Sequence, residues 1–288
     1  MPNSPIHIRR ALPEDSAACG RICYEAFAAI NGKHNFPPEL PSVDVATGMV
    51  GGVFAHPAFY CVVAEADGRI IGSNCMDERS AIAGIGPITV DPSSQNHGAG
   101  RLLMEAVLDR ARQKAFAGVR LVQAAFHNRS LSLYTKLGFV AREPLSVMRG
   151  APIGKKIPGC DVRPATHDDL ESCNRVAATV HGHHRSGEVL DSLKQGSAMV
   201  VERHGAITGY ATAFGYGGHA AALSNVDVMA LIAAAAEIPP PGMLVPTRNA
   251  ELFRWCLNSG LRVIQPMTLM TTGLYNEPVG PYLTSILY

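Results

Sequence analysis

The most constraining feature of this sequence is a short polar turn that leads directly into an amphipathic helix. The turn spans residues 91–100 and is rich in small polar residues and glycine, and the helix that follows runs to about Phe116 with apolar residues on one face. A helix that opens on a glycine turn leaves its first backbone N–H groups unpaired, with the positive end of the helix dipole behind them. Such a helix start suits a pyrophosphate group.

The residues of this turn exclude two common phosphate-binding loops. A P-loop would end in Gly-Lys-Ser or Gly-Lys-Thr, whereas this turn closes with Gly100-Arg101-Leu102 and has neither the lysine nor the hydroxyl. A dinucleotide-binding loop would place Gly-x-Gly-x-x-Gly near the start of a strand–helix–strand unit, whereas Gln-x-x-Gly-x-Gly follows a fourth predicted strand here. The turn must therefore be interpreted from the elements around it.

These elements alternate between strand and helix patterns. Before the turn come predicted helices at 15–30 and 42–54, a hairpin with strands at 60–66 and 69–76, and a strand at 81–90 whose glycines and proline predict a bulge or bend. After the helix come a strand at 118–126, a second helix that Asn128 and Ser130 are predicted to cap and that stops at Gly138, and another strand.

This order, with Gln-x-x-Gly-x-Gly before one helix and Tyr-x-x-x-Gly-Phe at the end of the next, resembles the GNAT family of N-acetyltransferases over about residues 6–145. The resemblance implies an α/β (α+β) fold with a mixed, mostly antiparallel, twisted sheet flanked by helices. It also implies acetyl-CoA as co-substrate. The positions that would bind it are Ile88 and Val90 at the pantetheine arm, Gln95, Gly98, Gly100 and Arg101 at the pyrophosphate, and Asn128 at the cofactor arm.

The same resemblance assigns Tyr134 as the catalytic acid. An amine that attacks the thioester directly expels a thiolate whose conjugate acid has a pKa of about 8.5. A tyrosine, with an ordinary pKa of about 10, stays protonated at neutral pH and can donate to the departing sulfur. The alternative is that Tyr134 is a structural core tyrosine.

The group that removes a proton from the amine is not specified by the sequence. The family carboxylate on the strand before the loop has no counterpart, because residues 82–90 contain no acidic residue. Glu25, His34, Glu78 and His127 are candidates, each of which could instead be a solvated or structural residue. None is assigned as the base.

The second half of the chain echoes the first. Ile8-Arg9-Arg10-Ala11 is matched by Val162-Arg163-Pro164-Ala165, and similar matches follow further along. We therefore predict two tandem GNAT-like domains, at residues 1–149 and 160–288, joined by a linker at 150–159 that is rich in Gly, Pro and Lys.

The second copy departs from the family pattern where the chemistry would lie. Only Ser224-Asn225 separates its strand at 220–223 from its helix at 226–237, so there is no pyrophosphate loop, and Cys256 stands where Tyr134 stands in the first copy. We predict a degenerate domain. Its tyrosine-bearing tail, residues 275–288, either lines an acceptor cleft or simply packs.

Composition limits the partners and the location. The chain has 25 Lys and Arg against 24 Asp and Glu, and this balance predicts no attraction to nucleic acid or membranes. Because the sequence has no signal-like start or long apolar run, we expect a cytoplasmic protein. The 7 cysteines form no Cys-x-x-Cys pair and are expected to be reduced and mostly buried. We expect no metal, because the cluster His181, His183 and His184 lacks a carboxylate or cysteine at ligand spacing.

The sequence thus predicts an acyl-CoA-dependent N-acetyltransferase that moves an acetyl group to a primary amine of a small molecule or peptide. A second hypothesis is a non-catalytic acyl-CoA-binding or sensing protein, and a third is an interaction protein in which neither half binds CoA. The identity of the acceptor and the oligomeric state are not encoded in any motif.

Overall fold

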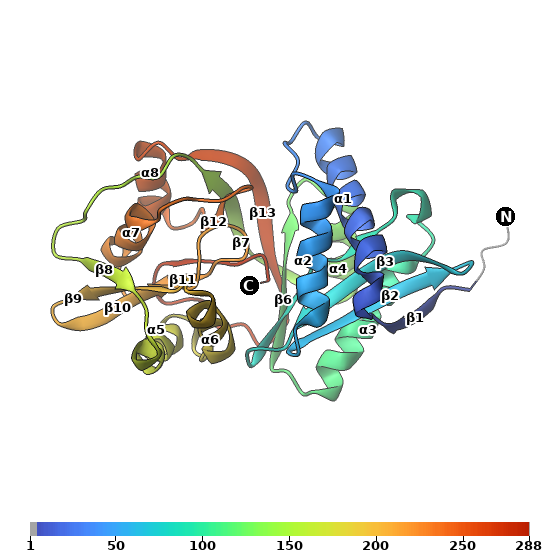
Figure 1. Ribbon diagram of the computed structural model, residues 1–288, viewed down its shortest axis with the longest axis horizontal. Helices are drawn as coiled ribbons and strands as arrows, with labels where there is room; N and C mark the ends of the chain where they lie inside the picture. The colour runs from blue at the N-terminus through green and yellow to red at the C-terminus, as the bar shows by residue number, and fades with distance from the viewer. Residues whose placement is uncertain (1–4, 288) are drawn as a thin grey trace.

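The computed structural model describes residues 5–287, and two halves of the molecule lie side by side in it (Figure 1). The first half contains β1 (His7–Arg10), α1 (Ser16–Lys33), α2 (Val43–Ala55), β2 (Phe59–Ala66), β3 (Arg69–Asp77), β4 (Ile82–Ile85), β5 (Thr89–Val90), α3 (Ala99–Gln113), β6 (Gly118–Ala124), α4 (Asn128–Lys136) and β7 (Val140–Arg149). The second half contains β8 (Asp161–Pro164), α5 (Leu170–His181), α6 (Ser186–Gln195), β9 (Met199–Arg203), β10 (Ala206–Ala211), β11 (Ala220–Ala222), α7 (Asn225–Ala234), β12 (Met243–Pro246), α8 (Ala250–Asn258), β13 (Arg262–Gly273) and β14 (Tyr282–Leu283).

Helices cover both faces of the first half's sheet, as predicted. Alternate residues of β2 face opposite sides, so that Val63 packs with α1 and α2 while Val62 and Ala64 pack with α3. The turn between β2 and β3 has positive φ at Asp67 and Gly68, as a tight hairpin requires. The predicted strand at 81–90 is broken into β4 and β5. The mixed, mostly antiparallel α/β fold is therefore confirmed.

The two halves exchange strands through one continuous sheet. Its order is β1-β2-β3-β4-β6-β13-β7-β12, so β13 of the second half lies between β6 and β7 of the first, and β7 lies between β13 and β12 of the second. The exchanged strands run where the two halves meet (Figure 1). Neither half would close its sheet alone, because removing the other half would expose strand edges. The division that we predict at residues 150–159 falls in the loop between β7 and β8 and remains a prediction.

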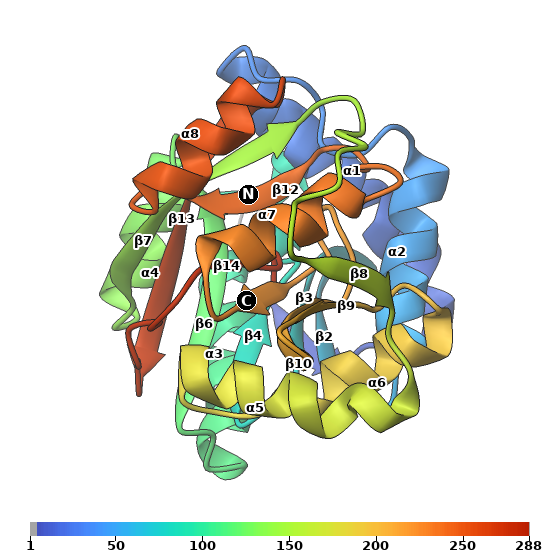
Figure 2. The same ribbon diagram turned by 90° about the vertical axis from the view of Figure 1, so that its left-hand side faces the viewer.

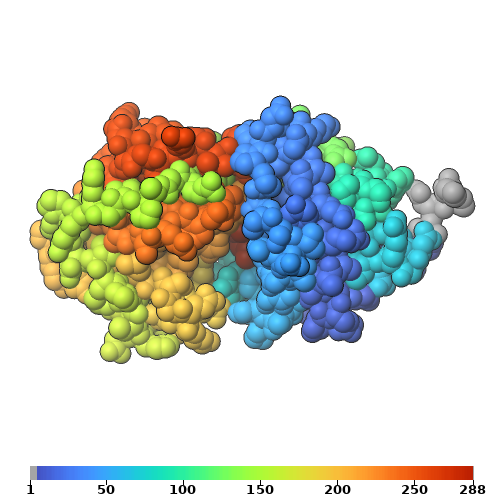
Figure 3. Space-filling view, turned by 45° about the horizontal axis from the view of Figure 1, so that its top comes forward, coloured from blue at the N-terminus to red at the C-terminus, as the bar shows by residue number. Residues whose placement is uncertain are grey.

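A second sheet, of five strands in the order β14-β11-β10-β9-β8, forms the rest of the second half. Helices α5 and α6 cover one of its faces, where Val200 and Tyr210 are buried, and α7 covers the other, where Val201 and Ala220 are buried (Figure 2). In the space-filling view the helices α1 and α2 abut the second half directly (Figure 3). Asp191 of α6 joins the halves by accepting hydrogen bonds from Arg79 and His56 at 3.1 Å each.

The internal repeat is visible in a pair of matching ion clusters. Arg9 binds Asp15 at 2.7 Å and also Glu65, and this clamp ties the first strand to the start of the first helix. Its counterpart Arg163 binds Asp169 at 2.7 Å and also Glu202. The repeat predicted from the sequence is therefore present at the level of side-chain contacts.

The C-terminal segment returns to the first half. Thr284 N donates to Leu244 O at 3.3 Å, and Ile286 N donates to Tyr216 O at 2.6 Å. Leu287 then lies against Gly84 and Gly86 of the first half, and the chain ends between the two halves (Figure 1). The segment thereby covers the face of β4 that points toward α1 and α2.

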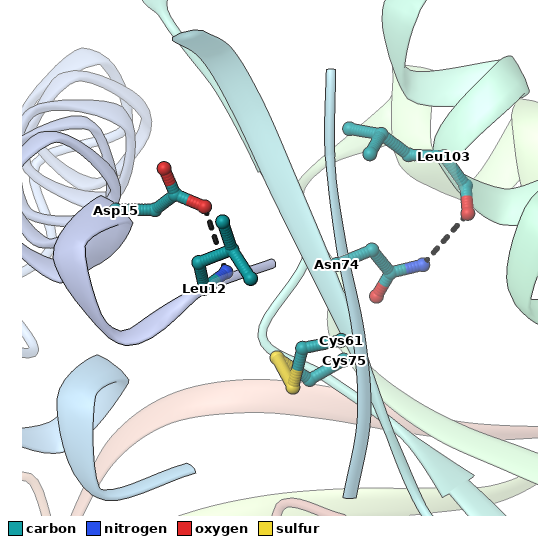
Figure 4. Close-up of a disulfide and its surroundings, with 6 residues drawn as sticks. All are labelled: Leu12, Asp15, Cys61, Asn74, Cys75 and Leu103. Carbon is teal, nitrogen blue, oxygen red and sulfur yellow. Dashed lines mark hydrogen bonds between the residues drawn. A yellow bond between two sulfur atoms is a disulfide. The ribbon is translucent and has the colours of Figure 1, made fainter. Parts of the chain in front are cut away.

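The prediction of reduced cysteines is wrong for two of them. Cys61 of β2 and Cys75 of β3 are direct cross-strand neighbours and form a disulfide (Figure 4). In Figure 4 the next side chain, Asn74, points to the other side of β3 and donates to Leu103 O at 3.3 Å. Among residues 5–287 the other cysteines are free and buried. The sequence spacing did not reveal the pair because the strand register sets it.

Substituting Gly84 by alanine is expected to displace the C-terminal segment. A Cβ at Gly84 would overlap the carbonyl oxygen of Leu287, which is backbone and cannot rotate away. We expect Gly84→Ala to lower the free energy of unfolding by about 1–3 kcal/mol, measured by urea denaturation. The matched control is Gly48→Ala in α2, which meets open space and should raise stability by about 0.5–1 kcal/mol. A Gly84→Ala variant as stable as the wild type would contradict this packing.

Candidate functional site

The candidate site begins where two central strands separate. Strand β4 pairs in parallel with β6 only from Ile82 to Gly84, and β5 pairs only with β3. Residues 86–91 stay attached to β3, through Gly86 N to Cys75 O and Asp91 N to Ile71 O at 2.9 Å each. Their opposite edge, which includes Ile88 and Val90, has no strand partner among residues 5–287. We call β6 and the segment of residues 86–91, which separate from each other here, the divergent strands.

The glycine turn lies at the end of the divergent strands. Gly98 is the N-cap of α3 and has a left-handed conformation with φ of 90°, which favours glycine. Its carbonyl accepts from Arg101 N at 3.0 Å and Leu102 N at 3.1 Å. Within the described part of the chain, the amides of Ala99 and Gly100 have no hydrogen-bond partner. Such amides, with the helix dipole behind them, are what an anion-binding helix start requires, and the pyrophosphate site stays a prediction.

Arg129 is a site residue that the sequence did not reveal. Its guanidinium donates from Nη1 to Asn96 Oδ1 at 3.0 Å and from Nη2 to Gln95 Oε1 at 2.5 Å, which brings a positive charge onto the turn. Gln95 in turn donates from Nε2 to Val90 O at 3.2 Å. The predicted Arg101 instead pairs with Glu105 at 2.7 Å. The only sequence signal for Arg129 was its position next to Asn128.

The predicted cap of α4 is wrong by one residue. His127 is the N-cap, and its Nδ1 accepts from Ser130 N at 3.1 Å, while Ser130 Oγ donates to His127 O at 2.8 Å. A neutral imidazole can act in this way because one ring nitrogen is an acceptor. Asn128 begins the helix and is exposed, and its side chain is not used in capping. Its exposed side chain is therefore accessible to a ligand.

Tyr134 of α4 belongs to the apolar cluster between the sheet and the helices α3 and α4. It is 7% exposed and packs in one cluster with Leu121 of β6, with Ile88 and Val90 at the edge of that cluster. Burial raises the pKa of its hydroxyl above the ordinary range, so the group stays protonated at neutral pH. The structure thus places the tyrosine beside the divergent strands, on the α3 and α4 side of the sheet.

The four candidate bases are largely engaged elsewhere. Glu78 accepts two hydrogen bonds from Arg110, at 2.7 and 3.0 Å, and Glu25 pairs with Arg21 at 2.8 Å. His34 packs against Phe126 with ring centroids 5.2 Å apart. Burial, with the charge of Arg129 second, lowers the pKa of His127 to about 4, which makes it a poor proton acceptor at neutral pH.

The second half has no equivalent of this site. Ser224 caps α7 directly, accepting from Asp227 N, so no loop intervenes between β11 and the helix. Cys256 is fully buried in α8, and burial raises the pKa of its thiol to about 12.

Two further searches of residues 5–287 gave negative results. No group of three His, Cys, Asp or Glu residues in this range could hold a metal ion. No helix in the same range is long and apolar enough to cross a membrane.

The cap of α4 leads to a prediction about pH. Because the pKa of His127 falls from 6.5 to about 4 on folding, the unfolded chain binds more protons between these values, and stability falls as pH falls through them. We expect His127→Asn, which keeps a capping side chain but cannot titrate, to weaken this loss of stability, as measured by denaturation between pH 7 and about pH 4. His127→Ala separates the effects, since losing the cap should remove about 1 kcal/mol at every pH. An unchanged pH dependence in both variants would refute the assignment.

Comparison with known proteins finds a family similarity in the segment that carries this site. The model of the acetyltransferase (GNAT) family matches residues 28–139, which include the divergent strands, the glycine turn and Tyr134. A mycothiol acetyltransferase of Nocardia farcinica (strain IFM 10152) is 36% identical over 63 residues, which are 22% of this chain and 21% of that protein. The matched region therefore covers about a fifth of the length of this curated relative.

Solved structures extend the similarity to the whole fold. A candidate acetyltransferase of Pyrococcus horikoshii superposes with a TM-score of 0.76 and 17% identity, covering 96% of this chain and 92% of that one. A tandem GNAT protein from the clavulanic acid biosynthesis pathway superposes with a TM-score of 0.56 and 13% identity, covering 93% and 98% of the two chains. The GNAT family match is thus confined to residues 28–139, and the chain as a whole has the fold of a tandem GNAT protein.

Proposed function

We propose that the first half binds acetyl-CoA and transfers its acetyl group to a primary amine. The observation that carries this proposal is the position of the unpaired amides of Ala99 and Gly100 at the end of the divergent strands. The amides suit a pyrophosphate, and the backbone edge at Ile88 and Val90, which has no strand partner among residues 5–287, suits the amide groups of a pantetheine arm. Arg129 adds charge at the pyrophosphate end, and Asn128 adds a free polar side chain.

The residues present fit this co-substrate. Nothing lies within 4 Å of a Cβ built on Gly98, so the turn is open on its outer side. Acetyl-CoA would supply a thioester whose carbonyl carbon the amine attacks directly. The sulfur would leave on the side of Tyr134, whose hydroxyl can donate a proton to it. The family match over residues 28–139 supports this reading.

A second candidate function is acyl-CoA binding without turnover. It is favoured by the absence of an acidic residue from positions 82–90, and by the engagement of Glu25, Glu78 and His127 in other contacts. The two functions differ in free-thiol release from acetyl-CoA when amino sugars, polyamines, amino acids and peptides are supplied as acceptors.

Removal of the Tyr134 hydroxyl tests its role as the acid. We expect Tyr134→Phe to bind CoA with an affinity close to that of the wild type, because the ring still fills the apolar cluster. Its kcat for acetyl transfer should fall by about 100-fold, since general acid catalysis contributes about this much. Free-thiol release and calorimetric CoA binding measure the two quantities. Normal turnover in this variant would make Tyr134 a structural residue.

A negative charge at the start of α3 tests the pyrophosphate site. Gly100→Glu places a carboxylate beside the proposed phosphates, and we expect the affinity for CoA to fall at least about tenfold, equivalent to about 1.4 kcal/mol. Gly48→Glu is the matched control, because it adds the same charge to α2 on the opposite face of the sheet and meets open space. Equal CoA affinities of the two variants would place the pyrophosphate elsewhere.

A further inference from the structure

A buried carboxylate that no motif indicates lies in the loop between α1 and α2. Glu39 is 8% exposed, and its Oε1 accepts from Gln265 Nε2 of β13 at 2.8 Å and from Asn31 Nδ2 of α1 at 3.4 Å. Burial raises the pKa of this carboxyl, and the two hydrogen bonds offset only part of the effect. We call Glu39, Asn31 and Gln265 the acceptor cluster.

The acceptor cluster has more hydrogen-bond acceptors than donors. Asn31 and Gln265 are each 1% exposed, and within residues 5–287 neither Asn31 Oδ1 nor Gln265 Oε1 has a partner. A buried polar atom without a partner destabilises a fold by about 1–3 kcal/mol. A hydrogen-bond donor placed at this cluster would satisfy both amide oxygens.

The cluster lies at the end of β6, on the face of the sheet opposite Tyr134. Met267 of β13 pairs with Ala124 of β6, so Gln265 lies just beyond the end of β6. Gln265 Nε2 also donates to Tyr216 Oη at 2.7 Å. The carbonyl oxygen of Tyr216 accepts a hydrogen bond from Ile286 N. The Ile286 side chain packs in one cluster with Val122 and Ala124 of β6, on the face of the sheet away from Tyr134.

The loop that carries Glu39 is fixed over the same end of β6. Phe36 of this loop stacks on Phe126 with ring centroids 4.3 Å apart. A thioester held between the divergent strands would therefore have a proton donor on one side, at Tyr134, and a carboxylate on the other, at Glu39.

We propose that the acceptor cluster is the subsite for the amino group of the acceptor, and that Glu39 takes the proton that the amine must lose. An ammonium group has three N–H donors and a positive charge, which match the unpartnered oxygens and the carboxylate. This inference rests on the proposed acetyl transfer, and it names the substrate as an amine that arrives as a cation.

The proposed steps balance as follows. The ammonium gives one proton to Glu39, and the free amine forms a C–N bond with the carbonyl carbon. As the C–S bond breaks, Tyr134 gives its proton to the sulfur and is restored by the second proton that the nitrogen loses. The products are the amide, the CoA thiol and protonated Glu39, which releases its proton to water.

The test compares a cation with a neutral molecule of the same shape. The full chain, saturated with CoA, is titrated by calorimetry with n-butylammonium chloride and with n-butanol. We expect the wild type to bind the ammonium at least about tenfold more tightly than the alcohol, and Glu39→Gln to lose this preference while keeping its CoA affinity. Glu14→Gln is the control, because Glu14 is exposed and lies outside the acceptor cluster. Gln265→Met keeps the carboxylate but removes one oxygen, and should bind the ammonium more weakly than the wild type.

Turnover gives the second readout. With an amine that the wild type acetylates, kcat/KM should fall by about 100-fold in Glu39→Gln and should not change in Glu14→Gln. A wild type that does not prefer the ammonium, or a Glu39→Gln variant that keeps the preference or full turnover, would overturn the inference. Failure of the proposed function itself would be seen differently, as no acetyl transfer by the wild type to any amine class.

Discussion

The structure depends on the insertion of β13 between β6 and β7. Backbone hydrogen bonds along both edges of β13 join the C-terminal part of the chain to the centre of the first half's sheet. This insertion supplies a sheet partner for β6 on the edge away from β4, so that β6 can separate from β4 and remain part of a ladder. It also carries Gln265 from the second half to the end of β6. The candidate site is therefore assembled from both halves of the sequence.

The two halves have kept the same framework and diverged in chemistry. The clamps of Arg9 and Arg163 on the start of α1 and α5 are nearly identical, because each fixes a strand to a helix wherever the fold is repeated. The second half lacks the glycine turn, and a buried Cys256 replaces the tyrosine. This half instead provides β13 and the C-terminal segment up to Leu287. That segment lies against Gly84 and Gly86 on the side of the sheet that carries α1 and α2.

Backbone groups left without partners define the proposed cofactor site, and side-chain oxygens left without partners define the proposed acceptor site. The first set presents N–H donors at Ala99 and Gly100, which suit anions. The second presents oxygen acceptors at Asn31 and Gln265 beside the Glu39 carboxylate, which suit a cation. Two sets of opposite polarity, on either side of one pair of separating strands, fit a reaction between an anionic carrier and a cationic amine.

The sequence by itself determined the local elements and the part of the site that one continuous segment builds. The turn before α3, the hairpin at Asp67 and the helix with Tyr134 follow from periodicity, glycine and capping residues close together in the chain, and the repeat of the segment around Arg9 follows from matching residues in the two halves. Only the tertiary structure decided the insertion of β13, the pairing of Cys61 with Cys75, and the burial of Glu39. These features depend on strand register and on contacts between residues far apart in the chain, which no local pattern of residues encodes.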